Sequence, residues 1–422
     1  MASEALAGIL VQVAALTLAV EFLARRLLGP RQAIGDEVEY LFRARSSAPL
    51  LHEPFLRVPL YPAFLWLVGR RLGERGIDLA LILVAVVSTT AAAAAGGLLF
   101  GDVVAAVTGV MLALCPDRWV LSRRLWPDTL LALHASLLLY FLVAARLQAG
   151  AAAGISPVMF WILGGLVAAA TLVRIDALVL GFAVTLLAPR AGWFPRLSLL
   201  GLAFAGLVLA AVFNGRRFRR WLPDDTFLFN LRLMVEDRSG KPLEPTMIRL
   251  GSAWRSEDAS ARGRLTGQAL RAGLRRPWVA VLAFARRGWS LTGADTFAIE
   301  KLVAPDSSAF PGMKPLVRRV VSTALRAGFP LLLALSCASL TVANEWLHRP
   351  DLWLAGAILL PAMLFTARTR YRFAALFCLA PGAGVSVATL AVGAAEARVI
   401  VLVVALVLLS LFLAAPRRAE SW

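Results

Sequence analysis

Several stretches of this chain contain no charged residue over the length that a helix needs to cross a bilayer. Residues 79–100 and 399–415 contain no Lys, Arg, Asp or Glu, and a spanning helix needs about 20 apolar residues. Because lipid offers no hydrogen-bond partners, the backbone of such stretches must satisfy its own N–H and C=O groups. The alternating segments of about ten residues that indicate a transmembrane barrel are not seen. The sequence therefore predicts an all-α polytopic membrane protein.

The composition agrees with this fold class. Hydrophobic residues make up 59% of the 422 residues and charged residues only 17%, against about 25% in soluble domains. The net charge is +18, and most basic residues are arginines between the apolar runs, where they can meet anionic head groups or phosphate-bearing lipids. Nucleic acid is the rival partner of a basic chain, but no soluble basic domain is present to bind it. Cys115, Cys337 and Cys378 show no metal-ligand spacing, and three cysteines cannot close a disulfide set.

The apolar runs predict a bundle of about eleven transmembrane helices in a single domain, 1–422. The first run lies between Glu4 and Arg25 without a cleavage site, so we expect an anchoring helix and not a cleaved signal peptide. A charged interruption between the fifth and sixth runs predicts two short helices or one broken helix. The expected spans are 5–24, 79–99, 103–121, 128–147, 157–173, 175–188, 197–214, 319–342, 351–367, 373–393 and 399–415.

Two polar segments, 29–77 and 215–318, separate the spans. With the N-terminus inside, the count of spans places both on the outer face. This predicts a cytoplasmic (inner) membrane protein whose site faces the periplasm or the cell exterior. The short outer connections carry arginines, among them Arg123, Arg124 and Arg372, and this excess opposes the positive-inside rule. Either the orientation is inverted or these arginines serve a purpose outside.

Both polar segments contain helical patterns. Residues 36–45 place apolar side chains such as Val38 and Phe42 at helical spacing. Residues 62–72 form a short amphipathic stripe with basic neighbours, which is typical of a helix that lies in the membrane interface. Residues 275–290 repeat this pattern with two tryptophans as interfacial anchors. The loops therefore predict amphipathic helices on the outer face.

Adjacent carboxylates follow the first span. Asp36 and Glu37 lie in the sequence Gly-Asp-Glu-Val-Glu-Tyr, and such a pair can act as a general base toward a hydroxyl or amine, or bind a divalent cation. The alternative is structural, because acids are common at helix starts, where they cap the helix and meet its dipole. The pair alone does not decide between these readings.

Further outer positions could contribute to the same site. Arg57 precedes a turn fixed by two prolines that flank Leu60 and Tyr61. Arg57 could hold a phosphate and Tyr61 could line a groove, or both could anchor the chain in the interface. Asp128 opens an apolar run on the same predicted face, where it could add a carboxylate or simply begin a helix.

Charged residues also lie within or between the later apolar runs. Arg174 and Asp176 lie inside an apolar region, where ionisable residues are costly and usually pair or line a polar cavity. Two residues apart, they do not face each other on one helix, which predicts a chain break or separate partners. Arg370, Tyr371 and Arg372 form a basic aromatic connection that suits bidentate phosphate contacts or membrane anchoring.

Other common signatures are missing from the sequence. His52, His134 and His348 show no spacing typical of a metal site, and no Walker-type glycine loop or dinucleotide fingerprint occurs. The one cofactor that the sequence allows is a divalent cation at Asp36 and Asp128.

Taken in order, these motifs resemble the GT-C superfamily of glycosyltransferases that use polyprenyl-phosphate sugars. The similarity is to the bacterial branch of the protein mannosyltransferase and aminoarabinose-transferase type. It rests on an acidic dyad with a following Tyr, a basic residue before a Pro-aromatic turn, a carboxylate that opens a later span, and a late Arg-Tyr segment. The matching residues are Asp36, Glu37, Tyr40, Arg57, Tyr61, Asp128, Arg370, Tyr371 and Arg372. The Leu-Val-Arg-Ile-Asp sequence that ends at Asp176 is similar to the Leu-x-Arg-Pro-Glu break of the family, with Ile in place of Pro and Asp in place of Glu.

The resemblance covers most of the chain and implies a reaction. A sugar would pass from a polyprenyl-phosphate donor to an extracytoplasmic acceptor (a glycolipid, a cell-wall glycan or a protein), with inversion at the anomeric carbon. Asp36 would take the acceptor's proton, while Glu37 and Asp128 would orient the acceptor or bind a cation. Arginines would hold the phosphate leaving group and offset its charge. The implied substrate-binding residues are Tyr40, Arg57, Tyr61, Arg123, Arg174, Asp176, Arg370, Tyr371 and Arg372.

Two branches of the superfamily carry a large soluble C-terminal domain, the oligosaccharyltransferases and the arabinosyltransferases. No such domain follows the last span, so we expect this chain to differ from both.

Two other functions fit parts of the pattern. A lipid or solute transporter or flippase would account for the spans and the buried charges, but it predicts internal pseudo-symmetry, which the sequence does not show. A non-catalytic lipid-binding subunit would keep the arginines without needing Asp36. Loss of sugar transfer on replacement of Asp36 would separate an enzyme from both.

Overall fold

The protein is built from helices throughout the part of the chain that can be described. The computed structural model describes residues 4–34, 36–45, 58–151, 155–188, 193–218, 277–293, 298–343, 349–364 and 372–415, together with residues 264, 267 and 271. All regular secondary structure in these ranges is helical. Seven helices are long and apolar enough to cross a membrane, and four shorter apolar helices accompany them. The chain is therefore an all-α polytopic membrane protein, as the sequence predicts.

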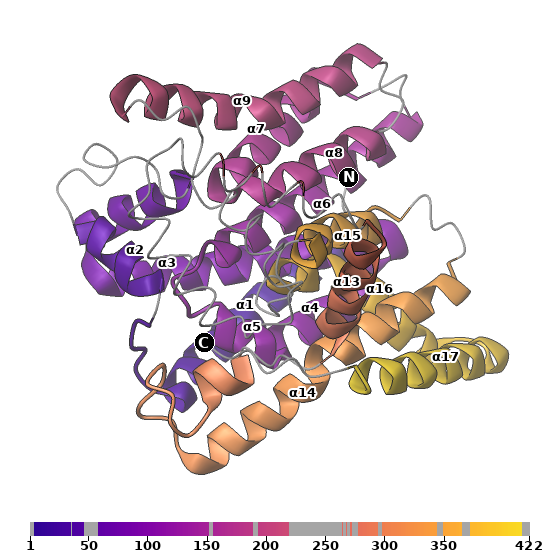
Figure 1. Cartoon of the computed structure of the whole chain (residues 1–422). Helices are drawn as coiled ribbons and strands as arrows, with labels where there is room; N and C mark the ends of the chain where they lie inside the picture. Colours follow the sequence, from indigo (N-terminus) through magenta and orange to yellow (C-terminus); the bar gives the residue numbers. More distant parts are fainter. Residues whose placement is uncertain are drawn as a thin grey trace.

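Most of the long helices lie roughly side by side in one bundle (Figure 1). The long apolar helices are α1 (Glu4–Leu28), α3 (Leu60–Phe100), α6 (Pro127–Ala151), α9 (Trp193–Phe218), α14 (Pro315–Ala338), α16 (Phe373–Val392) and α17 (Ala395–Leu413). The shorter apolar helices are α4 (Asp102–Leu114), α7 (Pro157–Val173), α8 (Leu178–Leu187) with the preceding 3₁₀ turn η1 (Ile175–Ala177), and α15 (Pro350–Leu364). The remaining elements are α2 (Asp36–Arg45), α5 (Pro116–Leu121), α13 (Pro277–Thr292), η3 (Ala298–Val303) and η4 (Ser339–Thr341).

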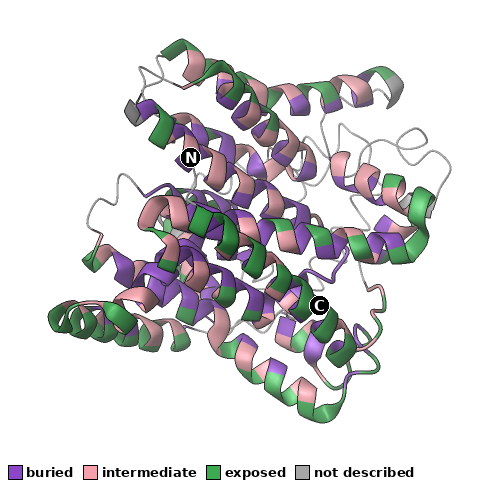
Figure 2. Cartoon of the chain, turned by 180° about the vertical axis from the view of Figure 1, so that it is seen from behind, coloured by how far each residue is buried: buried purple, intermediate pink, exposed green. Residues whose placement is uncertain are grey.

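Helix α16 lies at the centre of the bundle. Every residue from Phe373 to Ser386 is buried, and the helix packs against α3, α4, α6, α14 and α15. Small residues permit this close approach, since a Cβ atom at Gly384 would lie 2.6 Å from Oγ1 of Thr108 in α4. Helix α17, in contrast, is exposed along most of its length (Figure 2), and its Val and Leu side chains suit contact with lipid.

A glycine separates the predicted interfacial helix from the span that follows it. Both lie within α3, but Gly73 leaves helical geometry at φ 66° and ψ −164°. Because positive φ is accessible mainly to glycine, Gly73 marks the end of an amphipathic first part. Leu67 and Leu72 in that part are exposed, which fits a helix that meets the membrane interface.

Two predicted spans contain breaks. The sequence predicts one helix over 103–121, but the chain forms α4 and then α5, with Cys115 in extended conformation between them. Pro116 is the cause, because proline lacks an N–H and is favoured at the first position of a new helix. The predicted interruption between α7 and α8 is confirmed, since Arg174 is extended at φ −150° and ψ 130°.

The predicted helix at 36–45 forms, but it buries a face that the apolar pattern did not indicate. Val38 and Phe42 are exposed, at 56% and 75%. Glu37 and Tyr40 are buried instead. This short helix is therefore held by the ion pair of Glu37 and by the aromatic contact of Tyr40 with Tyr61, and not by the predicted stripe.

Candidate active site

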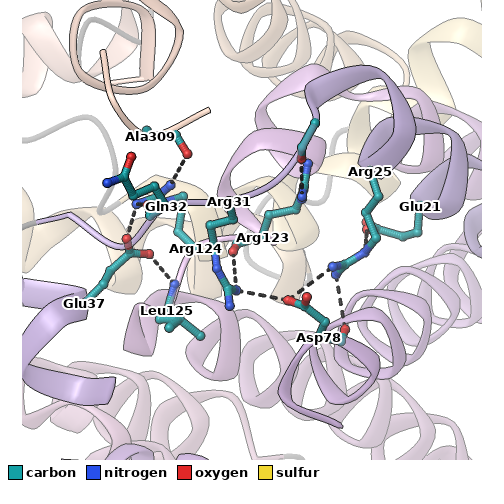
Figure 3. Close-up of polar contacts among 11 residues, drawn as sticks. Glu21, Arg25, Arg31, Gln32, Glu37, Asp78, Arg123, Arg124, Leu125 and Ala309 are labelled. Carbon is teal, nitrogen blue, oxygen red and sulfur yellow. Dashed lines mark hydrogen bonds and ion pairs between the residues drawn. The ribbon is translucent and has the colours of Figure 1, made fainter. Parts of the chain in front are cut away.

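Glu37 is fully buried at the start of α2, and its carboxylate has three donors. Figure 3 shows two of them, Arg124 and Leu125. Oε2 accepts a hydrogen bond from the backbone N–H of Ile34 at 3.0 Å, and Oε1 accepts one from the backbone N–H of Leu125 at 2.5 Å. The guanidinium of Arg124 forms a short ion pair with Oε2. The reach from Glu37 back to Ile34 resembles the return bond of a capping box. Glu37 therefore joins α2 to the connection between α5 and α6.

Arg124 occupies the centre of that connection. Its Nη2 also donates to the carbonyl of Gln32 at 3.1 Å, and its Nη1 donates to the carbonyl of Ala309 at 3.4 Å. The ring of Phe310 lies 5.5 Å from its Cζ, within cation–π range. Burial lowers the pKa of Arg124 from its ordinary value, and the Glu37 carboxylate opposes that shift. In the sequence, Arg124 is one of several arginines in the outer excess, and its partner cannot be read from spacing.

Asp128, Arg174 and Asp176 form a second ion-pair group. Asp128 lies in the first turn of α6, and its Oδ1 is 2.5 Å from Nη1 of Arg174. Arg174 also forms a two-pronged contact with Asp176, with Nε–Oδ1 at 2.9 Å and Nη2–Oδ2 at 2.5 Å. The chain break at Arg174 allows the guanidinium to turn toward a residue two positions on. The structure thus confirms the predicted break, but it is the break that lets Arg174 pair with Asp176 itself as well as with Asp128.

Two tyrosines lie near these groups. Tyr40 and Tyr61 are buried, and their rings meet edge to face with centroids 5.0 Å apart. Tyr61 lies within electrostatic reach of Tyr40, Glu37 and Asp128. Four predicted positions on α2, α3 and α6 therefore gather at one end of the bundle.

The remaining predicted positions differ in their placement. Asp36 is the first residue of α2 and is partly exposed. Arg57, Arg370 and Tyr371 lie outside the described residues. Arg123 is buried and donates from Nη2 to the carbonyl of Gly29 at 2.8 Å.

Arg372 has a different environment from the other predicted residues. Its Nη1 donates to the carbonyls of Leu291 and Gly293, at 2.7 Å and 2.6 Å. The ring of Phe329 lies 4.1 Å from its Cζ, and Oδ1 of Asp117 lies 3.9 Å from its Nη2. Arg372 therefore joins α16 to the end of α13, to α14 and to α5.

A metal centre is not preassembled in the described part of the chain. No three His, Cys, Asp or Glu side chains gather there in a way that could hold an ion. Asp128 already has Arg174 on one oxygen. Asp36 and Asp128 could contribute at most two carboxylates, so further oxygen ligands for a cation would have to come from a substrate or water.

Several buried charges escaped the sequence analysis. Glu21 in α1 forms a short ion pair with Arg118 in α5, and both side chains are fully buried. Arg349 pairs with Asp351 through two contacts, Nε–Oδ1 at 2.9 Å and Nη2–Oδ2 at 2.7 Å, and thus repeats the Arg-x-Asp arrangement of Arg174. Ionisable residues inside or beside predicted spans are the signal that could have found them.

No protein-family model matches the chain, and no curated protein sequence is similar to it. The apo oligosaccharyltransferase of Archaeoglobus fulgidus is 12% identical, with a TM-score of 0.47 over 98% of this chain and 57% of that one. The same archaeal protein, AglB, in complex with an inhibitory peptide and a dolichol-phosphate, is 15% identical at a TM-score of 0.46, over 97% and 55% of the two chains. ArnT from Cupriavidus metallidurans is 18% identical at 0.37, over 97% and 78%.

The chain therefore spans little more than half the length of the archaeal protein. Because all these TM-scores lie below 0.5, the function is inferred from the chain's own residues.

Proposed function

We propose that this protein is a membrane glycosyltransferase of the GT-C type. It would move a sugar from a polyprenyl-phosphate donor to an extracytoplasmic acceptor, with inversion at the anomeric carbon. The observation that carries the proposal is a pair of carboxylate–arginine contacts at the start of α6, where Arg124 holds Glu37 and Asp128 holds Arg174. Carboxylates held beside arginines at a membrane face are the groups that acid–base chemistry on a phosphate-linked donor needs.

In this proposal the two adjacent carboxylates, Asp36 and Glu37, have different roles. Glu37 is fully buried, and its oxygens are committed to Arg124 and to two backbone N–H groups. It is therefore a positioning residue, which departs from its expected role as a direct ligand of acceptor or cation. Asp36 is adjacent and partly exposed. Asp36 is thus the group that can reach an acceptor hydroxyl or amine and take its proton.

The Asp128 group supplies a second function. Two carboxylates share one guanidinium, so Asp128, Arg174 and Asp176 together carry a net negative charge. Such a group favours an acceptor hydroxyl, an amine or a divalent cation over a bare phosphate. We assign Asp128 and Asp176 to orientation of the acceptor or a cation, and Arg174 to holding both carboxylates in place.

The donor phosphate needs cations, and the resemblance implies three arginines for this role. Arg57, Arg370 and Arg372 would hold it and offset the charge that develops on the leaving group, with Tyr40, Tyr61 and Tyr371 as lining residues. Arginine suits this role because its planar fork contacts two phosphate oxygens at once.

Sugar transfer by the purified full chain in liposomes, with a polyprenyl-phosphate sugar as donor, tests the proposal. Asp36→Asn should abolish transfer, because an amide cannot take the acceptor's proton, while the purified variant stays folded. Asp306→Asn is the matched control, since Asp306 is an exposed aspartate elsewhere on the chain. Full activity of Asp36→Asn would remove Asp36 as the base and favour a non-catalytic lipid-binding role.

A further inference from the structure

Helix α13 belongs to the polar segment 215–318, yet one of its faces is part of the bundle. The helix lies beside α15 (Figure 1) and also packs against α14 and α17. Leu282 and Trp289 are exposed, whereas Arg287 and Leu291 are buried. The polar segment is therefore joined to the spanning helices at α13.

Arg287 joins α13 to the last turn of α15. Its side chain is 2% exposed, and its Nη1 donates to the carbonyl of Met363 at 3.4 Å. The two helices approach closely at the next residue, because a Cβ atom at Gly288 would lie 2.4 Å from Cε of Met363. Carbonyls in the last turn of a helix have no partner within that helix. Arg287 thus caps α15 and fixes α13 against it.

Arg372, which directly precedes α16, holds the C-terminal end of α13. Its Nη1 donates to the carbonyls of Leu291 and Gly293, at 2.7 Å and 2.6 Å, where α13 ends. These carbonyls also lack partners within the helix, and a cation is favoured at a helix C-terminus. Arg372 is 1% exposed, so water does not compete for these contacts.

The same guanidinium reaches α5. Its Cζ lies 4.1 Å from the ring of Phe329 in α14, and its Nη2 lies 3.9 Å from Oδ1 of Asp117 in α5. Helix α5 leads directly into the connection that contains Arg124 and into the first turn of α6 with Asp128. A displacement of α13 would therefore reach the candidate site through Arg372 and α5.

We propose that Arg287 and Arg372 anchor α13 on the bundle and that this anchor positions the candidate site. Through the anchor, a helix of the polar segment sets the place of α5 and, beyond α5, of Arg124 and Asp128. Arg287 is a positioning residue, because its contact with Met363 lies in α15 and outside the site. The anchor itself does not depend on any reaction, whereas its effect on catalysis rests on the proposed function.

Hydrogen–deuterium exchange of the full chain in detergent, followed by mass spectrometry, tests the anchor. Arg287→Gln should raise amide exchange in residues 277–293 roughly ten-fold, the effect expected for one lost hydrogen bond from a charged donor. Arg372→Gln should raise exchange in the same segment. Arg287→Lys keeps a charged donor and should retain most of the protection. Exchange in α6 should stay unchanged in all three variants and serves as the internal reference.

Arg286→Gln is the matched control, because Arg286 is the preceding residue of the same helix and is exposed. Equal rises for Arg286→Gln and Arg287→Gln would overturn the anchor. A rise that includes α6 would also overturn it, because the variants would then destabilise the whole fold. Unchanged exchange of α13 in Arg372→Gln, with weaker binding of a polyprenyl phosphate, would make Arg372 a phosphate ligand and not an anchor.

Sugar transfer in liposomes tests the effect on catalysis. Arg287→Gln should lower kcat roughly five-fold and leave the KM for the polyprenyl-phosphate donor within about two-fold, and Arg287→Lys should restore kcat. A raised KM at unchanged kcat would contradict a positioning role. If the wild-type chain transfers no sugar, the proposed function is wrong and the catalytic part of this proposal falls with it, whereas the exchange of α13 still decides the anchor.

Discussion

Glu37 and Arg124 form an ion pair in the interior although 87 residues separate them in the chain. Both side chains are fully buried. The pair joins α2, which begins at Asp36, to the connection that leads into α6 and Asp128. The relative position of the two candidate carboxylates therefore depends on this ion pair.

Loss of the cation in this pair should destabilise the protein. Arg124→Gln leaves the Glu37 carboxylate buried without its counterion, which typically costs about 3–5 kcal/mol in the free energy of unfolding. Chemical denaturation in detergent micelles measures the change. The exposed Arg71→Gln should stay within about 0.5 kcal/mol, and the double variant Glu37→Gln with Arg124→Gln should lose less than the sum of the single changes. Similar small effects of Arg124→Gln and Arg71→Gln would contradict the assignment.

The planar geometry of the Arg174 guanidinium should matter more for sugar transfer than its positive charge. Arg174→Lys keeps the charge but cannot reproduce the two parallel contacts to Asp176 together with the contact to Asp128. We expect sugar transfer to fall roughly ten- to hundred-fold, since small displacements at a site can cost that much. The control is Arg196→Lys, because Arg196 donates to the carbonyl of Ala188 outside the site. If both lysine variants keep full activity, Arg174 does not position the site.

Gly382 in α16 lies beside the Arg349–Asp351 pair, and its replacement should destabilise the protein. A Cβ atom at Gly382 would lie 2.6 Å from Nη2 of Arg349 and 2.6 Å from Oγ of Ser336. Gly382→Ala should therefore lower the free energy of unfolding by about 1–3 kcal/mol, the usual effect of overpacking. Gly165→Ala has open space around it and should be neutral or slightly stabilising, because alanine favours a helix. A thermal unfolding scan compares them, and equal melting temperatures would show that the pair tolerates a displacement.

The break in α3 should depend on Gly73. Alanine at φ 66° costs about 1–2 kcal/mol, although the position has open space around it. Gly73→Ala should therefore destabilise the chain by that amount or straighten the helix. Gly201→Ala, also in open space but at ordinary helical geometry, should not. Double electron–electron resonance between labels at exposed Leu67 and Leu83 would detect straightening, and an unchanged distance at unchanged stability would contradict the role of Gly73.

The arginines of the connection after α5 bear on the predicted orientation. Arg123 and Arg124 contribute to the basic excess that opposes the positive-inside rule. Both are buried, one against the carbonyl of Gly29 and one against Glu37. These two side chains are integral to the fold and do not act as free loop charges, so they are weak indicators of topology.

The sequence predicted the helices well because each spanning run carries its own signal. Uninterrupted apolar length predicts a span without knowledge of any neighbour. Breaks were harder to predict. The interruption at Arg174 was visible as charge inside an apolar run, whereas the one at Cys115 depended on Pro116, which the apolar pattern of 103–121 concealed.

By itself, the sequence determined the membrane-spanning class, the approximate helix bounds and the choice of charged residues worth attention. These follow from local apolar length and from the cost of placing a charge beside lipid. Only the tertiary structure decided the partners, such as Glu37 with Arg124 and Asp128 with Arg174. A buried charge can pair with any opposite charge that the fold brings within a few ångströms. Spacing along the chain does not show which residue that partner is. The tertiary structure also changed the reading of the acidic pair, because burial commits Glu37 to structure and leaves Asp36 as the candidate base.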